Sequence, residues 1–219
     1  MSLPAAFLSD VAQLIPQDRR FDDPLSTLAF GTDASFYRLI PQLVIRVESE
    51  DEVVTLLQLA QRDRVPVTFR AAGTSLSGQA ISDSVLIVLG DNWNHREIRG
   101  QGTQIRLQPG VIGAQANAWL APFGRKIGPD PASINACKIG GIVANNASGM
   151  CCGTAQNTYH TLAGIRLVLP MAAAWTPKMP PACKPSASHM AHCLNAWPYW
   201  AARHEQILSW RQRSATNTA

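Results

Sequence analysis

A loop with almost no side-chain bulk follows a short apolar run, in the segment 69–80, which reads FRAAGTSLSGQA. The residues before it, 65–69, are mostly apolar with two valines, and they predict a strand that ends in this loop. Glycine lets a backbone approach a ligand closely, and successive N–H groups and hydroxyls can bind phosphate oxygens. Taken alone, the loop has two open interpretations: a tight turn that needs Gly and Ser for geometry, or a cradle for an anion.

Two common phosphate-binding patterns do not fit this sequence. Gly73 and Gly78 have the separation of a P-loop, but Gln79 and Ala80 stand where that motif needs a lysine and a hydroxyl residue. The Rossmann pattern fails as well, because its nearest candidate, at 100–102, lacks the third glycine. We therefore expect neither a nucleoside triphosphatase nor a Rossmann dinucleotide site.

The apolar pattern alternates between helical and extended segments. It predicts helices over 4–15, 48–64 and 113–124, and strands over 43–47, 65–69, 85–89, 105–107 and 165–169. Ser49 is the predicted N-cap of the second helix, with Glu52 as its capping-box partner. This order predicts an α+β or α/β fold.

A second segment dense in Gly, Asn, Ser and Ala begins at Gly128 and runs to the last predicted strand. It contains GPDPAS, CKIGGIVANNASG and the vicinal pair Cys151-Cys152. Loops of that length inside a compact domain are usually functional. Gly140, Gly141, Ser148 and Gly149 allow close backbone approach, and Asn145 and Asn146 supply amide donors. Two such segments in one small domain indicate a large polyanionic or planar ligand.

The charge and cysteine content exclude several classes of protein. The net charge of +4 comes from residues 171–219, because residues 1–170 hold 14 basic and 14 acidic side chains. The absence of a basic stripe in 1–170 argues against nucleic-acid binding. Five cysteines without metal-ligand spacing predict reduced thiols and no structural metal. We expect no membrane span and a cytoplasmic location, since no apolar run is long enough to cross a bilayer.

The two glycine-rich segments, in this order, resemble the FAD-binding domain of the FAD-linked oxidases. This family includes vanillyl-alcohol oxidase, D-lactate dehydrogenase and the glycolate oxidase flavin subunit, and the D-2-hydroxyglutarate type of dehydrogenase is the closest branch. The resemblance extends from GTDASFYR, at 31–38, to Leu169. It implies an α+β fold, a PCMH-type FAD-binding domain of two small α/β subdomains, truncated in this chain.

The resemblance also implies which residues bind FAD. In the first segment, backbone N–H groups and hydroxyls would wrap the diphosphate, without need of a lysine: Ala72, Gly73, Thr74, Ser75, Leu76, Ser77 and Gly78. In the second segment, the implied residues line the flavin, the ribityl chain, the phosphates and the adenine: Pro129, Pro131, Ser133, Ile139, Gly140, Gly141, Asn145, Ser148, Gly149 and Ile165. Relatives with covalent flavin read R-x-G-G-H-S here, whereas this chain has Thr74 in place of the histidine, so non-covalent FAD is expected.

The implied reaction is the oxidation of a small 2-hydroxy acid such as lactate, glycolate or 2-hydroxyglutarate, with an unknown electron acceptor. No catalytic residue is assigned, because relatives supply the substrate groups from a downstream cap. Arg38 is interpreted as a salt-bridged surface residue, His160 as a structural hydrogen-bond partner, and Cys151 and Cys152 as packing residues. An iron–sulfur cluster belongs only to longer relatives.

The resemblance stops at Pro170. We expect a helical lead-in over 1–30, an incomplete FAD-binding domain over 31–170 and an atypical segment over 171–219. The last segment holds four of the six Trp and five basic residues against Glu205, and it has the character of an out-of-frame extension. Two functions stay open: part of an FAD-dependent hydroxyacid dehydrogenase, or a remnant or flavin-binding subunit that needs a partner chain for its cap.

Overall fold

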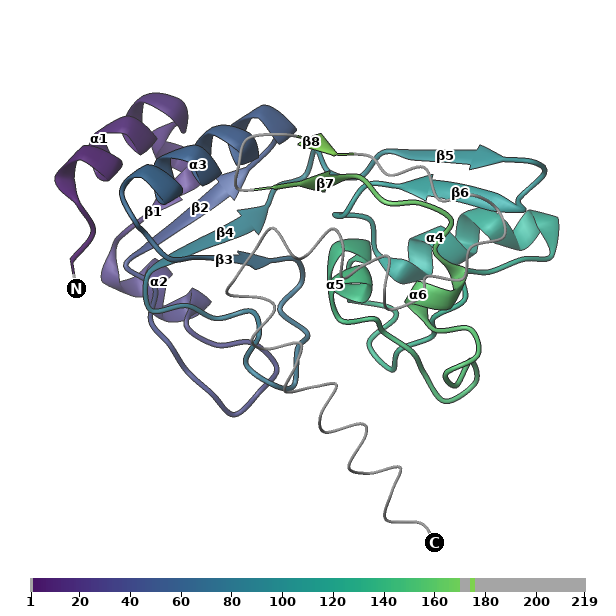
Figure 1. The fold of residues 1–219 in the computed structure, drawn as a ribbon. Coiled ribbons are helices and arrows are strands. Elements are labelled where there is room, and N and C mark those ends of the chain that lie inside the picture. Colours follow the sequence, from purple (N-terminus) through teal and green to yellow (C-terminus); the bar gives the residue numbers. More distant parts are fainter. Residues whose placement is uncertain (1, 170–173, 176–219) are drawn as a thin grey trace, which may run out of the picture. The chain divides into compact units, whose positions relative to one another are not determined.

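The computed structural model describes residues 2–169 and 174–175, and a four-stranded sheet organises the first half of the chain (Figure 1). The sheet contains β1 (Arg20–Phe21), β2 (Leu43–Val47), β3 (Val67–Arg70) and β4 (Val85–Leu89) in the order β1-β2-β4-β3. β2 and β3 both pair with β4 in parallel, whereas β1 pairs with β2 antiparallel. The carboxyl ends of three strands therefore lie at one edge of the sheet, where ligands commonly bind in open α/β sheets.

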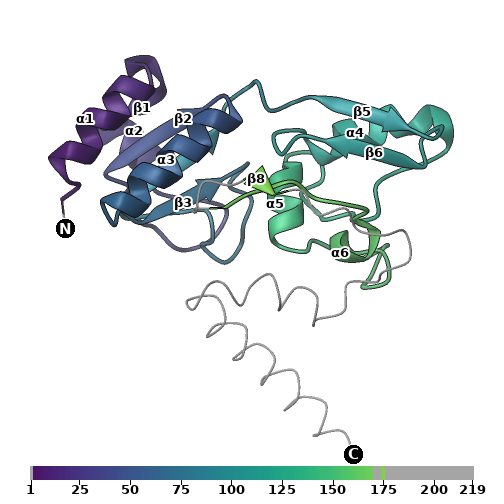
Figure 2. The same cartoon turned by 45° about the horizontal axis from the view of Figure 1, so that its top comes forward.

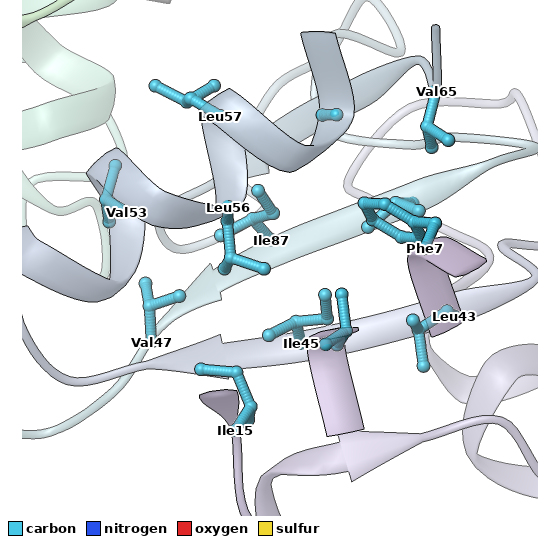
Figure 3. Close-up of a cluster of buried hydrophobic side chains, with 13 residues drawn as sticks. Phe7, Ile15, Leu43, Ile45, Val47, Val53, Leu56, Leu57, Val65 and Ile87 are labelled. Carbon is cyan, nitrogen blue, oxygen red and sulfur yellow. The ribbon is translucent and has the colours of Figure 1, made fainter. Parts of the chain in front are cut away.

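Two helices cover one face of this sheet. α1 (Ala5–Leu14) and α3 (Glu50–Arg62) lie side by side over β2 and β4 (Figure 2). Alternate strand residues point toward them, and the buried cluster includes Leu43, Ile45 and Val47 of β2 with Val85 and Ile87 of β4 (Figure 3). The period-two pattern of a strand thus places one set of side chains in the main core.

The opposite face of the sheet carries a smaller cluster formed by the residues in between. Val44, Leu86 and Val88 are buried there, with Phe21 and Phe30 packed against them. Phe30 is the last residue of α2 (Pro24–Phe30), which Asp23 caps by accepting hydrogen bonds from the N–H groups of Leu25 and Ser26. Because β2 and β4 are apolar on both faces, both faces of the sheet are covered, as in α/β folds.

The predicted capping box of α3 forms only in part. Ser49 accepts a hydrogen bond from the Glu52 N–H at 3.2 Å, as expected. The Glu52 carboxylate, however, accepts from the Glu48 N–H at 2.7 Å rather than from the Ser49 N–H, and it also binds the Arg19 guanidinium at 2.8 and 2.9 Å. A long-range ion pair therefore takes the place of the local reciprocal bond.

The second half of the described chain consists of short elements. β5 (Arg96–Arg99) and β6 (Gln104–Leu107) form an antiparallel hairpin, and α4 (Gly113–Leu120) continues into a 3-10 turn at Ala121–Phe123. α5 (Ile139–Ala144) and α6 (Thr158–Thr161) follow, and then β7 (Leu167–Val168) pairs antiparallel with β8 (Ala174–Trp175).

The predicted α+β fold class is confirmed, with local corrections. The strand predicted at 65–69 runs from Val67 to Arg70, because Val65 is buried in the turn after α3, where its N–H binds the Ala60 carbonyl. The segment predicted as one long loop after Gly128 contains α5 and α6. In α5 the apolar residues Ile139, Ile142 and Val143 recur at the i, i+3, i+4 spacing of a helix. The predicted segment 171–219 lies outside the described residues, apart from 174–175.

Candidate functional site

The glycine-rich loop after β3 presents a row of unused backbone donors. Gly73 and Gly78 have φ values of +69° and +68°, a conformation that side chains rarely adopt. The four consecutive N–H groups from Gly73 to Leu76 donate to nothing in the described part of the chain, whereas those of Ser77 and Gln79 donate to the Ser75 hydroxyl. Successive unpaired N–H groups in a loop form a concave site for an anion.

The segment before Arg38 supports this loop from one side. The Gly73 carbonyl accepts a hydrogen bond from the Ala34 N–H at 3.0 Å, and the Asp33 carboxylate accepts from the Ala80 N–H at 3.4 Å. Partial burial acts to raise the pKa of Asp33, but hydrogen bonds from Ser35 and Ala80 and the charge of Arg70 outweigh it and lower the pKa. The loop is therefore fixed at both ends before any ligand binds.

The second glycine-rich segment meets the first at α5. An added Cβ at Gly141 would lie 3.8 Å from the Ala71 Cβ, so the two segments predicted to form one site are in contact. The N–H groups of Ile139 and Gly140 donate to the carbonyls of Val111 and Pro109, at 2.8 and 2.9 Å. These bonds orient α5 so that the Gly141 side of the helix faces the loop after β3.

A carboxylate holds the segment after α5. Asp130 accepts hydrogen bonds from the N–H groups of Cys151 and Cys152, both at 3.2 Å. These bonds from Cys152 and Cys151 hold the pKa of the Asp130 carboxyl below its usual range. An added Cβ at Gly149 would collide with the Asp130 carboxylate and backbone carbonyl, so only glycine fits. Asp130 thus joins the GPDPAS and ASGMCC stretches.

The remaining predicted residues lie in this segment as well, without a shared contact that would define a role. Pro129 is buried, Pro131, Ser133 and Ile165 are half-buried, and Asn145 and Ser148 are exposed. Asn146 acts structurally, because its side-chain oxygen accepts from the Tyr159 N–H at 2.9 Å.

Four other residues behave partly as expected. The His160 imidazole Nδ1 lies 2.7 Å from the Thr154 carbonyl oxygen, which confirms the structural interpretation. Cys152 is buried and Cys151 exposed, and both are free thiols. The exposed Arg38 has no ion pair to a described residue, so the expected salt bridge does not form there; its backbone bridges Thr32 instead.

Sequence reasoning missed the charged residues that hold the two segments. Arg70, Asp33 and Asp130 all contact or flank the glycines, but none stands in a pattern that distinguishes it from a surface charge. Asp130 lies between two prolines in GPDPAS, and Arg70 is the last residue before the bare loop. These sequence neighbours are the features by which Asp130 and Arg70 could have been singled out.

Comparison with known families agrees with this geometry. The family described as "FAD binding domain" matches residues 41–174. The chain belongs to this family. The match extends from before β2 to the first residue of β8 and therefore includes both glycine-rich segments.

Curated relatives share the same region. The glycolate oxidase subunit GlcD of Escherichia coli K12 is 38% identical over 135 residues, which is 61% of this chain and 27% of the relative. The D-2-hydroxyglutarate dehydrogenase of the same strain is 31% identical over 146 residues, 65% of this chain and 14% of the relative. The chain thus spans about a quarter or less of the curated relatives it matches.

Solved structures confirm the fold. An alkyldihydroxyacetonephosphate synthase superimposes with a TM-score of 0.70 at 19% identity, over 86% of this chain and 37% of that one. The 6-hydroxy-D-nicotine oxidase of Arthrobacter nicotinovorans gives 0.63 at 19% identity, over 75% and 36%. The predicted PCMH-type FAD-binding fold is confirmed. Within 2–169 and 174–175, every helix is too short or too polar to cross a membrane.

Proposed function

We propose that the two glycine-rich segments of this chain bind FAD for a flavin-dependent oxidoreductase that acts on a D-2-hydroxy acid. The observation that carries this proposal is the contact of Gly141 with Ala71 beside the four unused N–H groups of 73–76. A family of FAD binding domains matches the same residues. The unused N–H donors of this loop suit a ligand with several acceptor oxygens, and a dinucleotide diphosphate has them.

The described residues fit FAD at the first segment. The loop would hold the diphosphate by its N–H groups and by the hydroxyls of Thr74, Ser75 and Ser77, and the two positive-φ glycines keep the site free of side chains. In the second segment, Gly140 and Gly141 would lie along the ribityl chain and phosphates. The other residues assigned to this cradle are Ala72, Leu76, Gly78, Pro129, Pro131, Ser133, Ile139, Asn145, Ser148, Gly149 and Ile165.

The flavin is proposed to bind without a covalent bond. Thr74 occupies the place where covalently flavinylated relatives carry a histidine, and a threonine hydroxyl is a poor nucleophile at neutral pH. Protein precipitated in acid should therefore release all of its flavin into the supernatant. Flavin fluorescence that stays with the denatured protein on a gel would contradict this point.

The substrate class follows from the relatives' names, glycolate oxidase and D-2-hydroxyglutarate dehydrogenase. FAD, when bound, supplies the ring that accepts hydride from the substrate carbon. The chain's described residues bind and orient that cofactor, and we assign to none of them the carboxylate-binding or proton-accepting role. We infer that these groups come from a substrate-binding region, in the same protein or in a partner chain.

The first test is the visible absorption spectrum of the desalted full chain, before and after incubation with FAD. We expect a flavin band near one equivalent per chain. Gly141→Val should weaken FAD binding, because the added side chain enters the contact with Ala71, whereas Ala144→Val changes an exposed position of the same helix. A chain that acquires no flavin would refute the FAD proposal.

The reaction is tested separately, with a dye as electron acceptor. Glycolate, D-lactate and D-2-hydroxyglutarate are offered to the FAD-loaded chain, alone and mixed with a polypeptide that corresponds to the remaining length of a curated relative. Dye reduction by one D-acid and not by its L-enantiomer supports the proposed activity. If the FAD-loaded chain reduces the dye with none of the three acids, either alone or with the second polypeptide, the substrate assignment is refuted and only FAD binding is left.

A further inference from the structure

A partly buried arginine lies directly beneath the glycine-rich loop. Arg70 ends β3, and its guanidinium touches the backbone at Gly73 so closely that an added Cβ there would collide with it. Nη1 donates to the carbonyls of Thr32 at 2.7 Å and Phe30 at 3.1 Å, and the guanidinium carbon lies 5.8 Å from the Phe30 ring centroid. The side chain is therefore held in one place, against the backbone at Gly73.

The charge of Arg70 has no carboxylate partner at ion-pair distance among the described residues. Asp33 acts on it from farther away, and partial burial lowers the pKa of Arg70. Its Nε and Nη2 donate to no described acceptor. A partly buried cation without a counter-ion is costly, unless a ligand supplies the negative charge.

The neighbouring Arg46 has a similar setting without the loop. Arg46 of β2 and Arg70 of β3 both pair in register with Val88 of the central strand, and Arg46 lies 5.3 Å from the Phe21 ring centroid. Both are half-buried cations stacked on a phenylalanine. Only Arg70 lies under Gly73, so Arg46 is a matched control from the same row of the sheet.

We propose that Arg70, whose guanidinium lies against the backbone at Gly73, supplies positive charge that holds the FAD diphosphate over the loop after β3. This inference rests on the proposed FAD site. It adds a cation to the expectation that backbone N–H groups and hydroxyls wrap the diphosphate. The diphosphate carries two negative charges, which both a guanidinium and unused N–H groups attract.

The experiment compares three ligands on Arg70→Gln, Arg70→Lys and Arg46→Gln in the full chain. FAD and ADP carry the diphosphate, whereas riboflavin lacks it. In Arg70→Gln we expect the Kd of FAD and of ADP to rise about tenfold to a hundredfold, and that of riboflavin to change less than about twofold. Arg70→Lys keeps the charge and should lose less, and Arg46→Gln should leave all three within about twofold.

Ionic strength provides a readout that a purely structural role would not move. Added salt should weaken FAD binding to the wild type and to Arg70→Lys, and the slope should flatten in Arg70→Gln, because screening acts on the charge. If Arg70→Gln does not fold, the wild-type slopes give a second test: FAD binding that depends on salt no more than riboflavin binding does would refute a cation at this site.

The failures of the two proposals are distinguishable. A wild-type chain that binds neither FAD nor ADP refutes the FAD site itself. Wild-type binding that Arg70→Gln leaves unchanged refutes the role of Arg70 alone. Equal losses of FAD, ADP and riboflavin in Arg70→Gln would also refute it, since they would show that Arg70 only anchors the 30–32 backbone.

Discussion

The two glycine-rich segments use their backbone in different ways. In the loop after β3, four consecutive N–H groups stay unused and a cation lies beneath them. In the segment after α4, several N–H groups near the glycines are bonded internally: those of Cys151 and Cys152 donate to Asp130, and that of Gly140 donates to the Pro109 carbonyl. The first segment is open toward a ligand, and the second is closed around Asp130, although its N–H groups at 148–150 also donate to no described acceptor.

This difference separates binding from support. A loop with unused donors gains its missing hydrogen bonds from the ligand, so changes there should alter affinity more than stability. A segment whose polar groups are satisfied internally contributes to the folded state itself, so changes there should alter stability first. The glycines of the two segments therefore have different roles, although they occur in similar sequence surroundings.

The largest expected effect is on stability, at Gly149. In Gly149→Ala the Cβ would collide with the Asp130 backbone and carboxylate, and backbone atoms cannot move aside as a flexible side chain can. We expect the free energy of unfolding to fall by about 2–3 kcal/mol. Gly153→Ala is the control in the same segment: its φ is +51°, but the added Cβ meets nothing within 4 Å. Equal urea midpoints for the two variants would contradict the closed segment.

The next effect is on affinity, at Gly73. Gly73→Ala combines a φ of +69° with a collision against the Arg70 guanidinium, whereas Gly124→Ala has a φ of +65° and open space. Both should lose about 1 kcal/mol of stability from backbone strain. Only Gly73→Ala should raise the Kd of FAD, by about tenfold or more. Titration of both variants with FAD measures this, and equal affinities would show that the loop does not bind the cofactor.

A smaller effect on stability is expected at Thr158, which is buried at the start of α6. Its hydroxyl donates to the carbonyls of Ala147 at 2.9 Å and Ile142 at 3.2 Å, and so joins α6 to the end of α5. Thr158→Val should cost about 1 kcal/mol, since it leaves these acceptors without that donor. Thr161→Val, in the same helix but exposed, should cost less than about 0.5 kcal/mol. Equal melting temperatures for Thr158→Val and Thr161→Val would argue against a stabilising role of the Thr158 hydrogen bonds.

The sequence predicted the parts of the molecule that depend on local pattern. The helices α1 and α3, the strands β2 and β4, and the capping of α3 by Ser49 follow from period, propensity and cap chemistry. The positive φ of Gly73 and Gly78 also follows from residue type, because the loop leaves little other use for glycine there.

Contacts between residues far apart in the chain could not be predicted from the sequence. Arg70 and Asp130 are single charges whose partners lie from 21 to 40 residues away along the chain. Glu52 was expected to bond its own helix start, and the Arg19 guanidinium, 33 residues away, binds it as well. No local period encodes such pairs, so the charged support of the site needed the structure.

The smallest expected effect tests whether charge or shape holds the closed segment. Hydrogen bonds from Cys152 and Cys151 lower the pKa of Asp130, so the ionised carboxylate stabilises the fold above the ordinary carboxyl pKa of about 3.9 and loses this effect as the pH falls through the lowered value. Asp130→Asn should therefore melt below the wild type at pH 7, and the gap should narrow below about pH 4. Melting curves between pH 7 and pH 3 measure this. A gap that stays constant would show that a neutral acceptor is enough, and that Gly149 packs on Asp130 by shape alone.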